Sequence, residues 1–340
     1  MNAVKTLVSD WWIGIHRSWE RFWFLPDRPH TLALIRILAG SLFFYTHLIW
    51  ALDLNAFLGA DGWIPTSLSR QMHEGTWAWS YLWYLESPTV LWGAHLLALM
   101  VFVMLTLGLF TRPVSALAWV IVISYCNRLE GMLFGLDQFN AMLAFYLMIG
   151  PSGAVYSLDR WLRSRQGETA GGETTKLVTA NVAIRLLQLH MCIIYLFGGI
   201  GKMRGDTWWD GSAFWYAIAL GEYQSMDMTW LVNYPWLIAL LAHVTVFWET
   251  FYCVIIWPKA TRPITLAIAL GVHGGIAAFL GMIPFGVAMI IGNVAFIPSA
   301  MTERVVENLT RVGKGKDDSE SLAATEAATA RRGRKRPRSG

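Results

Sequence analysis

Long apolar segments separated by short polar ones make up most of this chain of 340 residues. The longest are about twenty residues, the length at which a helix crosses the hydrocarbon core of a bilayer. The pattern therefore predicts an all-α, polytopic transmembrane helical bundle with about eight spans. Two of these spans are short, so we expect them to tilt or to be sheltered by their neighbours. The predicted spans are residues 32–52, 88–110, 114–126, 135–150, 178–201, 236–257, 264–280 and 284–297.

Aromatic and polar side chains are mixed in the segments beside these spans. Residues 1–31 interleave tryptophans with histidine and arginine, a mixture typical of an amphipathic helix in the lipid headgroup layer. Residues 53–87 and 214–230 have a similar aromatic content. The sequence therefore predicts an interfacial N-terminal segment (1–31), a transmembrane domain (32–298) and a disordered basic tail (299–340).

The composition favours a membrane protein over a soluble α/β enzyme. Hydrophobic residues make up 55% of the chain and charged residues 15%. A soluble enzyme of this length would not need apolar runs long enough to span a bilayer. The three cysteines, Cys126, Cys192 and Cys253, lie in apolar runs without paired spacing, which indicates small packing residues rather than disulfides.

Lysine and arginine are distributed unevenly over the segments between the spans. If the N-terminus is cytoplasmic, the cytoplasmic segments hold twenty-one of these residues and the opposite side holds four. Because basic residues concentrate on the cytoplasmic side, we expect both termini to be cytoplasmic, with Lys202 and Arg204 on the extracytoplasmic face. The basic run 331–338 could contact anionic lipid or RNA, but a topology anchor is the simpler interpretation, and no nucleic-acid partner is expected.

One face of the span at 178–201 carries polar groups along its length. The residues recur at steps of three and four, so they form a single stripe on a helix. A stripe with polar groups at both ends should face the bundle, where it would line a cavity leading to Lys202. Alternatively, its two basic ends extend to opposite headgroup layers and the middle is ordinary packing. The stripe consists of Arg185, Gln188, Cys192, Tyr195, Gly199 and Lys202.

Lys202 is the strongest candidate for chemistry. The glycines at 198, 199 and 201 would let another helix or a flat ligand approach closely. An amine in a partly dry pocket has its charged form disfavoured, which would let it act as a general base. A direct pairing with Asp206 or Asp210 would oppose this.

A second group of polar residues lies on the same predicted outer face. Asn127 and Arg128 precede Glu130, and Asp137 stands in the first turn of the next span. Arg128 could bind an anion or pair with Glu130, and Asp137 could simply stabilise the start of its helix. Glu249 lies in the middle of a span, where a carboxylate needs a partner or protonation. Because the histidines show no metal-ligand spacing, no metal is expected.

Four short motifs follow one another along the chain: Leu34-Ile-Arg36-Ile-x-x-Gly40, Asn127-Arg128 with Gly135-x-Asp137, Ser157-Leu-Asp159, and Gly198-Gly-x-Gly-Lys202 with Trp209-x-Gly211. In order and spacing they resemble the HTTM domain family, the membrane domain similar to vitamin K-dependent gamma-glutamyl carboxylase. The resemblance covers most of residues 15–300. It implies a helical bundle whose active face is lumenal or extracytoplasmic.

The resemblance also implies a role for Lys202. In the carboxylases, a lysine in the corresponding segment is held to deprotonate reduced vitamin K, whose oxygenation drives carbanion formation on glutamate and capture of carbon dioxide. Lys202 would be the catalytic base, and an arginine would stabilise an anion. The residues expected to bind substrate or lipid are Asn127, Arg128, Asp137, Arg185, Tyr195, Arg204 and Glu249.

The chain departs from the carboxylase pattern in three ways. Met203 follows Lys202 where the carboxylases have a second lysine, the spacing to Trp209-Asp210-Gly211 shifts by about one residue, and no large lumenal domain for substrate recognition is visible. From the resemblance we still expect a quinone-dependent carboxylase or oxygenase-type enzyme that uses reduced vitamin K or another quinone. Its partners would be membrane lipid and a protein substrate or accessory extracytoplasmic domain. The alternative is a non-catalytic membrane scaffold that binds lipid or quinone. A transporter would show an inverted repeat, and none is apparent.

Overall fold

The computed structural model describes residues 2–167 and 175–310, and within these ranges it is helical without a β-strand. Five helices are long and apolar enough to cross a membrane. This finding agrees with the predicted all-α class and indicates a multi-pass membrane protein. The five are α2 (His30–Trp50, continuing to Leu58 as a span), α5 (Pro88–Leu107), α9 (Val178–Met203), α12 (Pro235–Ile255) and α13 (Arg262–Phe279).

Helices also form at the other three predicted spans, but these helices are not both long and apolar enough to count as membrane spans. They are α6 (Thr111–Arg128), α7 (Gly135–Ile149) and α14 (Ile283–Val294). The first carries arginine at both ends, and the other two have 15 and 12 residues, short of the length that crosses a bilayer unaided. A sixth span results if α14 is joined to the helix Ser299–Thr310, from which it is bent by 112°. The count of eight spans therefore stays a prediction.

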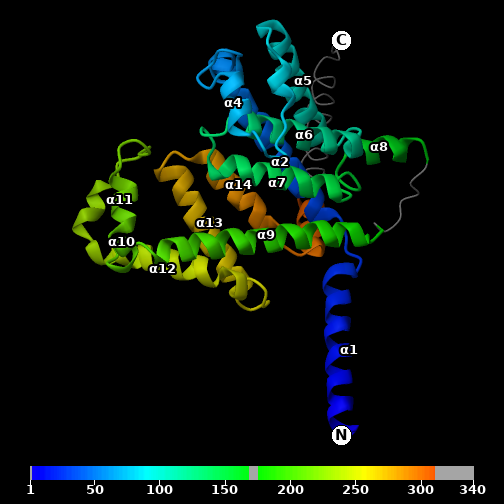
Figure 1. The fold of residues 1–340 in the computed structure, drawn as a ribbon. Coiled ribbons are helices and arrows are strands. Elements are labelled where there is room, and N and C mark those ends of the chain that lie inside the picture. The colour runs from blue at the N-terminus through cyan, green and yellow to red at the C-terminus, as the bar shows by residue number, and fades with distance from the viewer. Residues whose placement is uncertain (1, 168–174, 311–340) are drawn as a thin grey trace, which may run out of the picture.

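The eight helices at the predicted spans pack as neighbouring pairs. The closest are α9 with α12, α13 with α14, α6 with α7 and α2 with α5. The α14 helix contacts α2, α7 and α9, so it joins the two halves of the bundle. In Figure 1, α9 and α12 run side by side across the molecule, with the short helices α10 (Asp206–Trp209) and α11 (Ala213–Ala219) at their far end.

The remaining short helices lie in the connections. Between α2 and α5 these are η1 (Ala51–Asp53), α3 (Leu54–Leu58), α4 (Thr66–Met72) and η2 (Tyr81–Tyr84). Elsewhere they are α8 (Leu158–Arg165), which follows α7, and η3 (Thr229–Asn233), which precedes α12.

The N-terminal helix α1 (Asn2–Phe24) extends away from the bundle, across the direction of α9 (Figure 1). Its tryptophans Trp11, Trp12 and Trp19 are exposed. Its C-terminal end is held to the bundle, because the Asn181 side chain on α9 donates hydrogen bonds to the carbonyls of Phe22 and Trp23. An exposed aromatic helix at this angle is compatible with the predicted interfacial position, which stays a prediction.

The boundary predicted for the disordered tail is too early. Residues 299–310 form a helix rather than a disordered segment, and residues 311–340 lie outside the described residues. Glu303 on this helix forms ion pairs with Arg28 and with His30. The Thr302 and Thr31 hydroxyls lie 2.9 Å apart. These contacts with the start of α2 stabilise a helix that composition alone does not predict.

Asp159 on α8 holds the start of α6. Its carboxylate accepts hydrogen bonds of 2.8 Å from the backbone amides of Phe110 and Thr111 and from the Thr111 hydroxyl. Burial acts to raise the pKa of Asp159, but these hydrogen bonds and nearby Arg163 outweigh it and lower the pKa below its ordinary value.

We expect Asp159→Ala to lower the free energy of unfolding by about 1 kcal/mol at pH 7, the usual effect of losing a helix cap. A lowered folded-state pKa gives stabilisation that is present above the unfolded pKa and is lost as pH falls through the folded pKa. The difference between wild type and variant should therefore shrink below about pH 4. Unfolding in detergent, followed by tryptophan fluorescence from pH 3 to pH 7, would measure it; a difference independent of pH would contradict the assignment.

Candidate functional site

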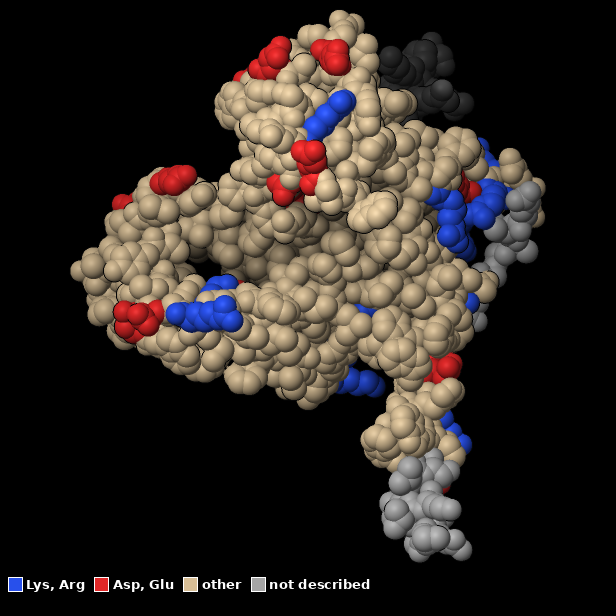
Figure 2. All heavy atoms as spheres, in the orientation of Figure 1, with Lys and Arg blue, Asp and Glu red and all other residues tan. Residues whose placement is uncertain are grey.

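A cavity of about 490 Å³ opens beside the C-terminal half of α9. Its walls come from the helices α9 to α14, and most of the lining residues are apolar. The space-filling view shows this face of the molecule hollowed between α10–α11 and the body of the bundle (Figure 2). The polar side chains among the lining residues are Tyr195, Lys202, Thr245, Glu249 and His273.

Lys202 and Glu249 form an ion pair in the cavity wall. The Lys202 Nζ donates to Glu249 Oε2 at 2.5 Å, and the carboxylate side chain is only 9% exposed. Glu249 lies on α12, which packs along α9, so helix packing joins residues that are 47 positions apart. The sequence correctly indicated that Glu249 needs a partner. That partner is Lys202. The amine of Lys202 therefore pairs with Glu249 instead of with Asp206 or Asp210.

Tyr195, about two turns before Lys202 on α9, starts a chain of buried hydrogen bonds. Its hydroxyl lies 2.7 Å from His273 Nε2 and accepts from Asn293 Nδ2 at 2.7 Å. The Tyr252 hydroxyl donates to Asn293 Oδ1 at 2.7 Å. This chain links α9, α12, α13 and α14 behind the ion pair and fixes the tyrosine hydroxyl toward the cavity side of α9.

Part of this hydrogen-bond chain is not evident from the sequence. The sequence does not mark His273, Asn293 or Tyr252 as members of one hydrogen-bond network. A usable signal was present for Asn293, because an amide inside an apolar helix needs a hydrogen-bond partner. No local pattern predicts which helix supplies that partner.

The predicted stripe on α9 faces the bundle. Gln188, Cys192, Tyr195 and Gly199 are buried. At Gly199, α9 approaches α12 so closely that a Cβ atom would lie 2.5 Å from Thr250 Oγ1 and 2.6 Å from Thr250 N. The absence of a side chain at this glycine therefore allows α12 to present Glu249 to Lys202.

We expect Gly199→Ala to destabilise the protein by about 1–3 kcal/mol, because the added methyl group must push α12 away from α9. Gly201→Ala is the matched control, since no atom lies within 4 Å of its Cβ position, and alanine favours the helix by about 1 kcal/mol. Thermal unfolding of both variants in the same detergent would test this. Equal midpoints for the two alanine variants would contradict the close approach.

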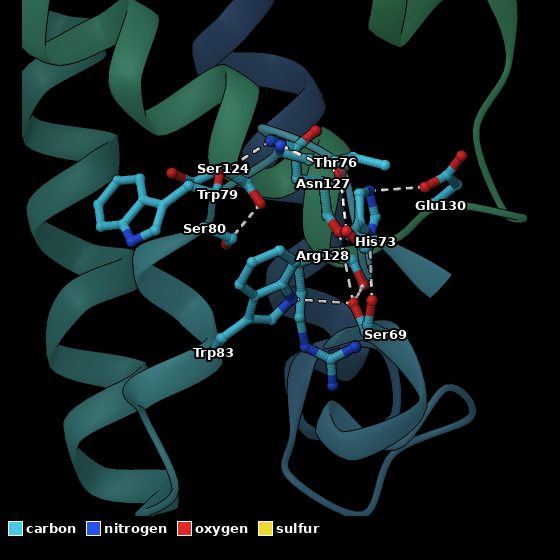
Figure 3. A network of polar contacts seen from close by, with 11 residues as sticks. Ser69, His73, Thr76, Trp79, Ser80, Trp83, Ser124, Asn127, Arg128 and Glu130 are labelled. Carbon is cyan, nitrogen blue, oxygen red and sulfur yellow. Dashed lines mark hydrogen bonds and ion pairs between the residues drawn. The ribbon is translucent and has the colours of Figure 1, made fainter. Parts of the chain in front are cut away.

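Arg128 and Asn127 are not in this cavity. Arg128 is fully buried, and its guanidinium donates to the carbonyls of Gly59 at 2.7 Å, Ile64 at 2.8 Å and Leu58 at 3.3 Å. Asn127 Nδ2 donates to Trp79 O at 2.8 Å. In Figure 3 the Arg128 guanidinium points toward the loop after α3 and away from Glu130. Both residues thus bind the connection between α2 and α5 rather than a ligand.

Glu130 and Asp137 also have structural partners. Glu130 Oε2 lies 2.6 Å from His73 Nε2, so the predicted pairing with Arg128 is replaced by a pairing with histidine (Figure 3). The Asp137 carboxylate accepts from the Phe134 amide at 2.9 Å and caps the start of α7, as the structural alternative predicted. The sequence placed this group on the same face as Lys202, but the structure does not bring it into the cavity.

The two remaining arginines lie apart from the cavity lining. Arg185 donates to the Phe22 carbonyl at 3.2 Å and to Gln188 Oε1 at 2.9 Å, and its guanidinium stacks over the Phe22 ring. It therefore attaches α1 to α9. Arg204 follows α9 and is exposed. Of the eight predicted site residues, the structure brings together Lys202, Tyr195 and Glu249.

The described residues contain no group of three or more His, Cys, Asp or Glu side chains arranged to hold a metal ion. Comparison of the chain with protein-family models, with curated proteins and with solved structures finds no match. The geometry of the cavity is therefore what indicates a function.

Proposed function

We propose that this chain is a multi-pass membrane enzyme of the carboxylase-like kind, in which Lys202 accepts a proton from a quinol or a similar lipid-like substrate. The observation that carries the proposal is an amine and a carboxylate 2.5 Å apart in the wall of an otherwise apolar cavity. Charged groups at membrane depth usually mark functional sites, because placing them there is costly.

The cavity fits a flat apolar ligand with a few polar atoms. Its volume of about 490 Å³ lies within the range of small-molecule sites, about 300–1,000 Å³. Aromatic and aliphatic side chains such as Phe214, Ile276 and Phe279 surround the polar groups on one wall. A bound reduced quinone would supply the ring hydroxyl whose deprotonation and oxygenation drive the chemistry of the carboxylases.

Lys202 and Glu249 can together accept a proton from a substrate at this wall of the cavity. Transfer of the Lys202 proton to Glu249 leaves a neutral amine that can accept a proton from a substrate hydroxyl. Such a transfer removes two charges from a mostly apolar cavity wall, which offsets part of the loss of the ion pair. Tyr195, held by His273 and Asn293, would orient the polar end of the substrate beside the amine.

The charge distribution supports an extracytoplasmic site. Lys202 ends α9, whereas α1 and α8 lie at its opposite end (Figure 1). Basic residues are concentrated in the connections at that opposite end, which we assign to the cytoplasm together with both termini. In this arrangement the HTTM-like domain has about eight spans, α1 lies in the headgroup layer, and a protein substrate or accessory domain would approach from outside.

Mass spectrometry of the molecules that co-purify with the protein would test the proposal. We expect a quinone with wild-type protein and at least a tenfold lower amount with Lys202→Ala. Lys259→Ala, which removes an exposed lysine elsewhere, is the control and should retain the wild-type amount. The same phospholipid in all three preparations, with no quinone, would refute the enzyme proposal.

A second candidate function is a non-catalytic scaffold that binds lipid or quinone. The observation that favours it is the ion pair itself, because a protonated lysine bonded to Glu249 is not available as a base. This function predicts a bound ligand without turnover. Oxygen consumption by purified protein supplied with a reduced quinone distinguishes the two.

A further inference from the structure

A second cavity, of about 350 Å³, lies at the other end of α9. It is bounded by the first turn of α6, the segment that follows α7, helix α8 and the residues just before α9. Leu177, the residue before α9, is among its lining residues. Because α9 is long and apolar enough to cross a membrane, a cavity at its first residue lies where that helix would enter the headgroup layer.

Three arginines line this cavity. Within the described residues, the Arg112 side chain makes no hydrogen bond or ion pair, and it is exposed. Arg163 donates to the Asp159 carbonyl through Nε at 3.2 Å, and Arg160 donates to the Ala154 carbonyl through Nη1 at 3.2 Å. Each therefore keeps terminal guanidinium N–H groups for a ligand. Figure 2 shows basic side chains gathered over α8.

The carboxylate in the cavity wall does not cancel this charge. Asp159 already accepts three hydrogen bonds, from the Phe110 amide and from the amide and hydroxyl of Thr111. Its oxygens thus face the start of α6, and its single negative charge opposes three positive ones. The cavity keeps a positive excess that favours an anion.

The surface of α8 indicates that the anion belongs to a lipid. Trp161 and Leu162 are 48% and 42% exposed on this short helix, next to Arg160 and Arg163. Arginines interleaved with exposed aromatic and aliphatic side chains are typical of segments that lie in the headgroup layer. A soluble inorganic anion has no apolar part that could contact Trp161 and Leu162.

We propose that this arginine-lined cavity binds the phosphate of an anionic lipid headgroup. Guanidinium groups from two helices would contact the phosphate oxygens, and Trp161 and Leu162 would lie against the upper acyl chains. The site is separate from the Lys202 cavity and does not depend on the function proposed for it.

Native mass spectrometry of the full chain in detergent, titrated with phosphatidylglycerol, tests this site. At low salt, Arg112→Gln with Arg163→Gln should weaken binding about 30-fold, since each basic residue near the surface contributes about a factor of five. Both side chains are exposed, so the variant should fold normally. The control is Lys259→Gln with Arg304→Gln, which removes the same charge from exposed positions outside the cavity and should leave binding unchanged.

Other outcomes would overturn the proposal. An equal loss in both double variants would show that only the overall charge matters. Equal affinity for phosphatidylcholine would show that the negative charge is not recognised. If inorganic phosphate raised the thermal midpoint of wild type but not of the Arg112 and Arg163 double variant, while phosphatidylglycerol did not bind, the site would belong to a soluble phosphate.

Discussion

Lys202→Ala is expected to lower quinone-dependent oxygen uptake by about 10²–10⁴-fold, the usual contribution of a positioned general base. After giving its own proton to Glu249, 2.5 Å away, the neutral amine in the cavity wall can take a proton from a substrate hydroxyl. The measurement is oxygen consumption by purified protein supplied with a reduced quinone. Uptake equal to that of wild type would refute a catalytic role for Lys202.

Two further variants separate catalysis from folding. Glu249→Gln keeps the size of the side chain and a hydrogen-bond acceptor but cannot take the proton from Lys202, so ligand binding should survive while uptake falls. Lys202→Met with Glu249→Gln removes both charges, and it should unfold at a midpoint closer to wild type than Lys202→Met alone, which leaves a partly buried carboxylate unpaired. A double variant less stable than either single variant would contradict the ion pair.

Arg128→Met is expected to lower the free energy of unfolding by about 3–5 kcal/mol, the largest stability effect anticipated here. Arg128 is fully buried, and its loss leaves the carbonyls of Leu58, Gly59 and Ile64 without this donor, each at a cost of about 1–3 kcal/mol before relaxation. The connection between α2 and α5 should also become sensitive to protease. Thermal unfolding and limited proteolysis would measure both effects.

Arg70→Met is the matched control for Arg128→Met. Arg70 lies in the same connection and also donates to a backbone carbonyl, that of Trp83, but it is exposed. Its loss should cost about 1 kcal/mol or less because water can replace the donor. If the two variants were equally stable and the Arg128 variant instead lost ligand, the anion-binding role that the sequence suggested would be restored.

The motif residues that carried the family resemblance have mixed roles in the structure. Arg36 is buried and donates to the Tyr156 carbonyl, and Asp159 caps α6, so both act in the architecture of one end of the bundle. Arg128 does the same at the loop after α3. Of these motifs, the one ending in Lys202 lies at the candidate site. A resemblance based on short motifs therefore gives stronger guidance to the helical framework than to the chemistry.

The sequence by itself determined where helices form and which face of α9 turns inward. Helices lie at all eight predicted segments, and the buried stripe through Gln188 and Tyr195 follows the helical period. These features are local, because hydrophobic periodicity and the need to shield polar groups act within one segment. Whether α7 and α14 cross the membrane is not decided locally, since helices of 15 and 12 residues depend on their neighbours for shelter from lipid.

Only the tertiary structure decided which polar groups meet. Lys202 pairs with Glu249 because α9 and α12 pack closely at Gly199, and Tyr195 meets His273 and Asn293 because α13 and α14 pack behind them. The same packing directs Arg128 to backbone carbonyls instead of a ligand. Partner choice depends on the relative rotation and spacing of helices far apart in the chain, and no single segment encodes these quantities.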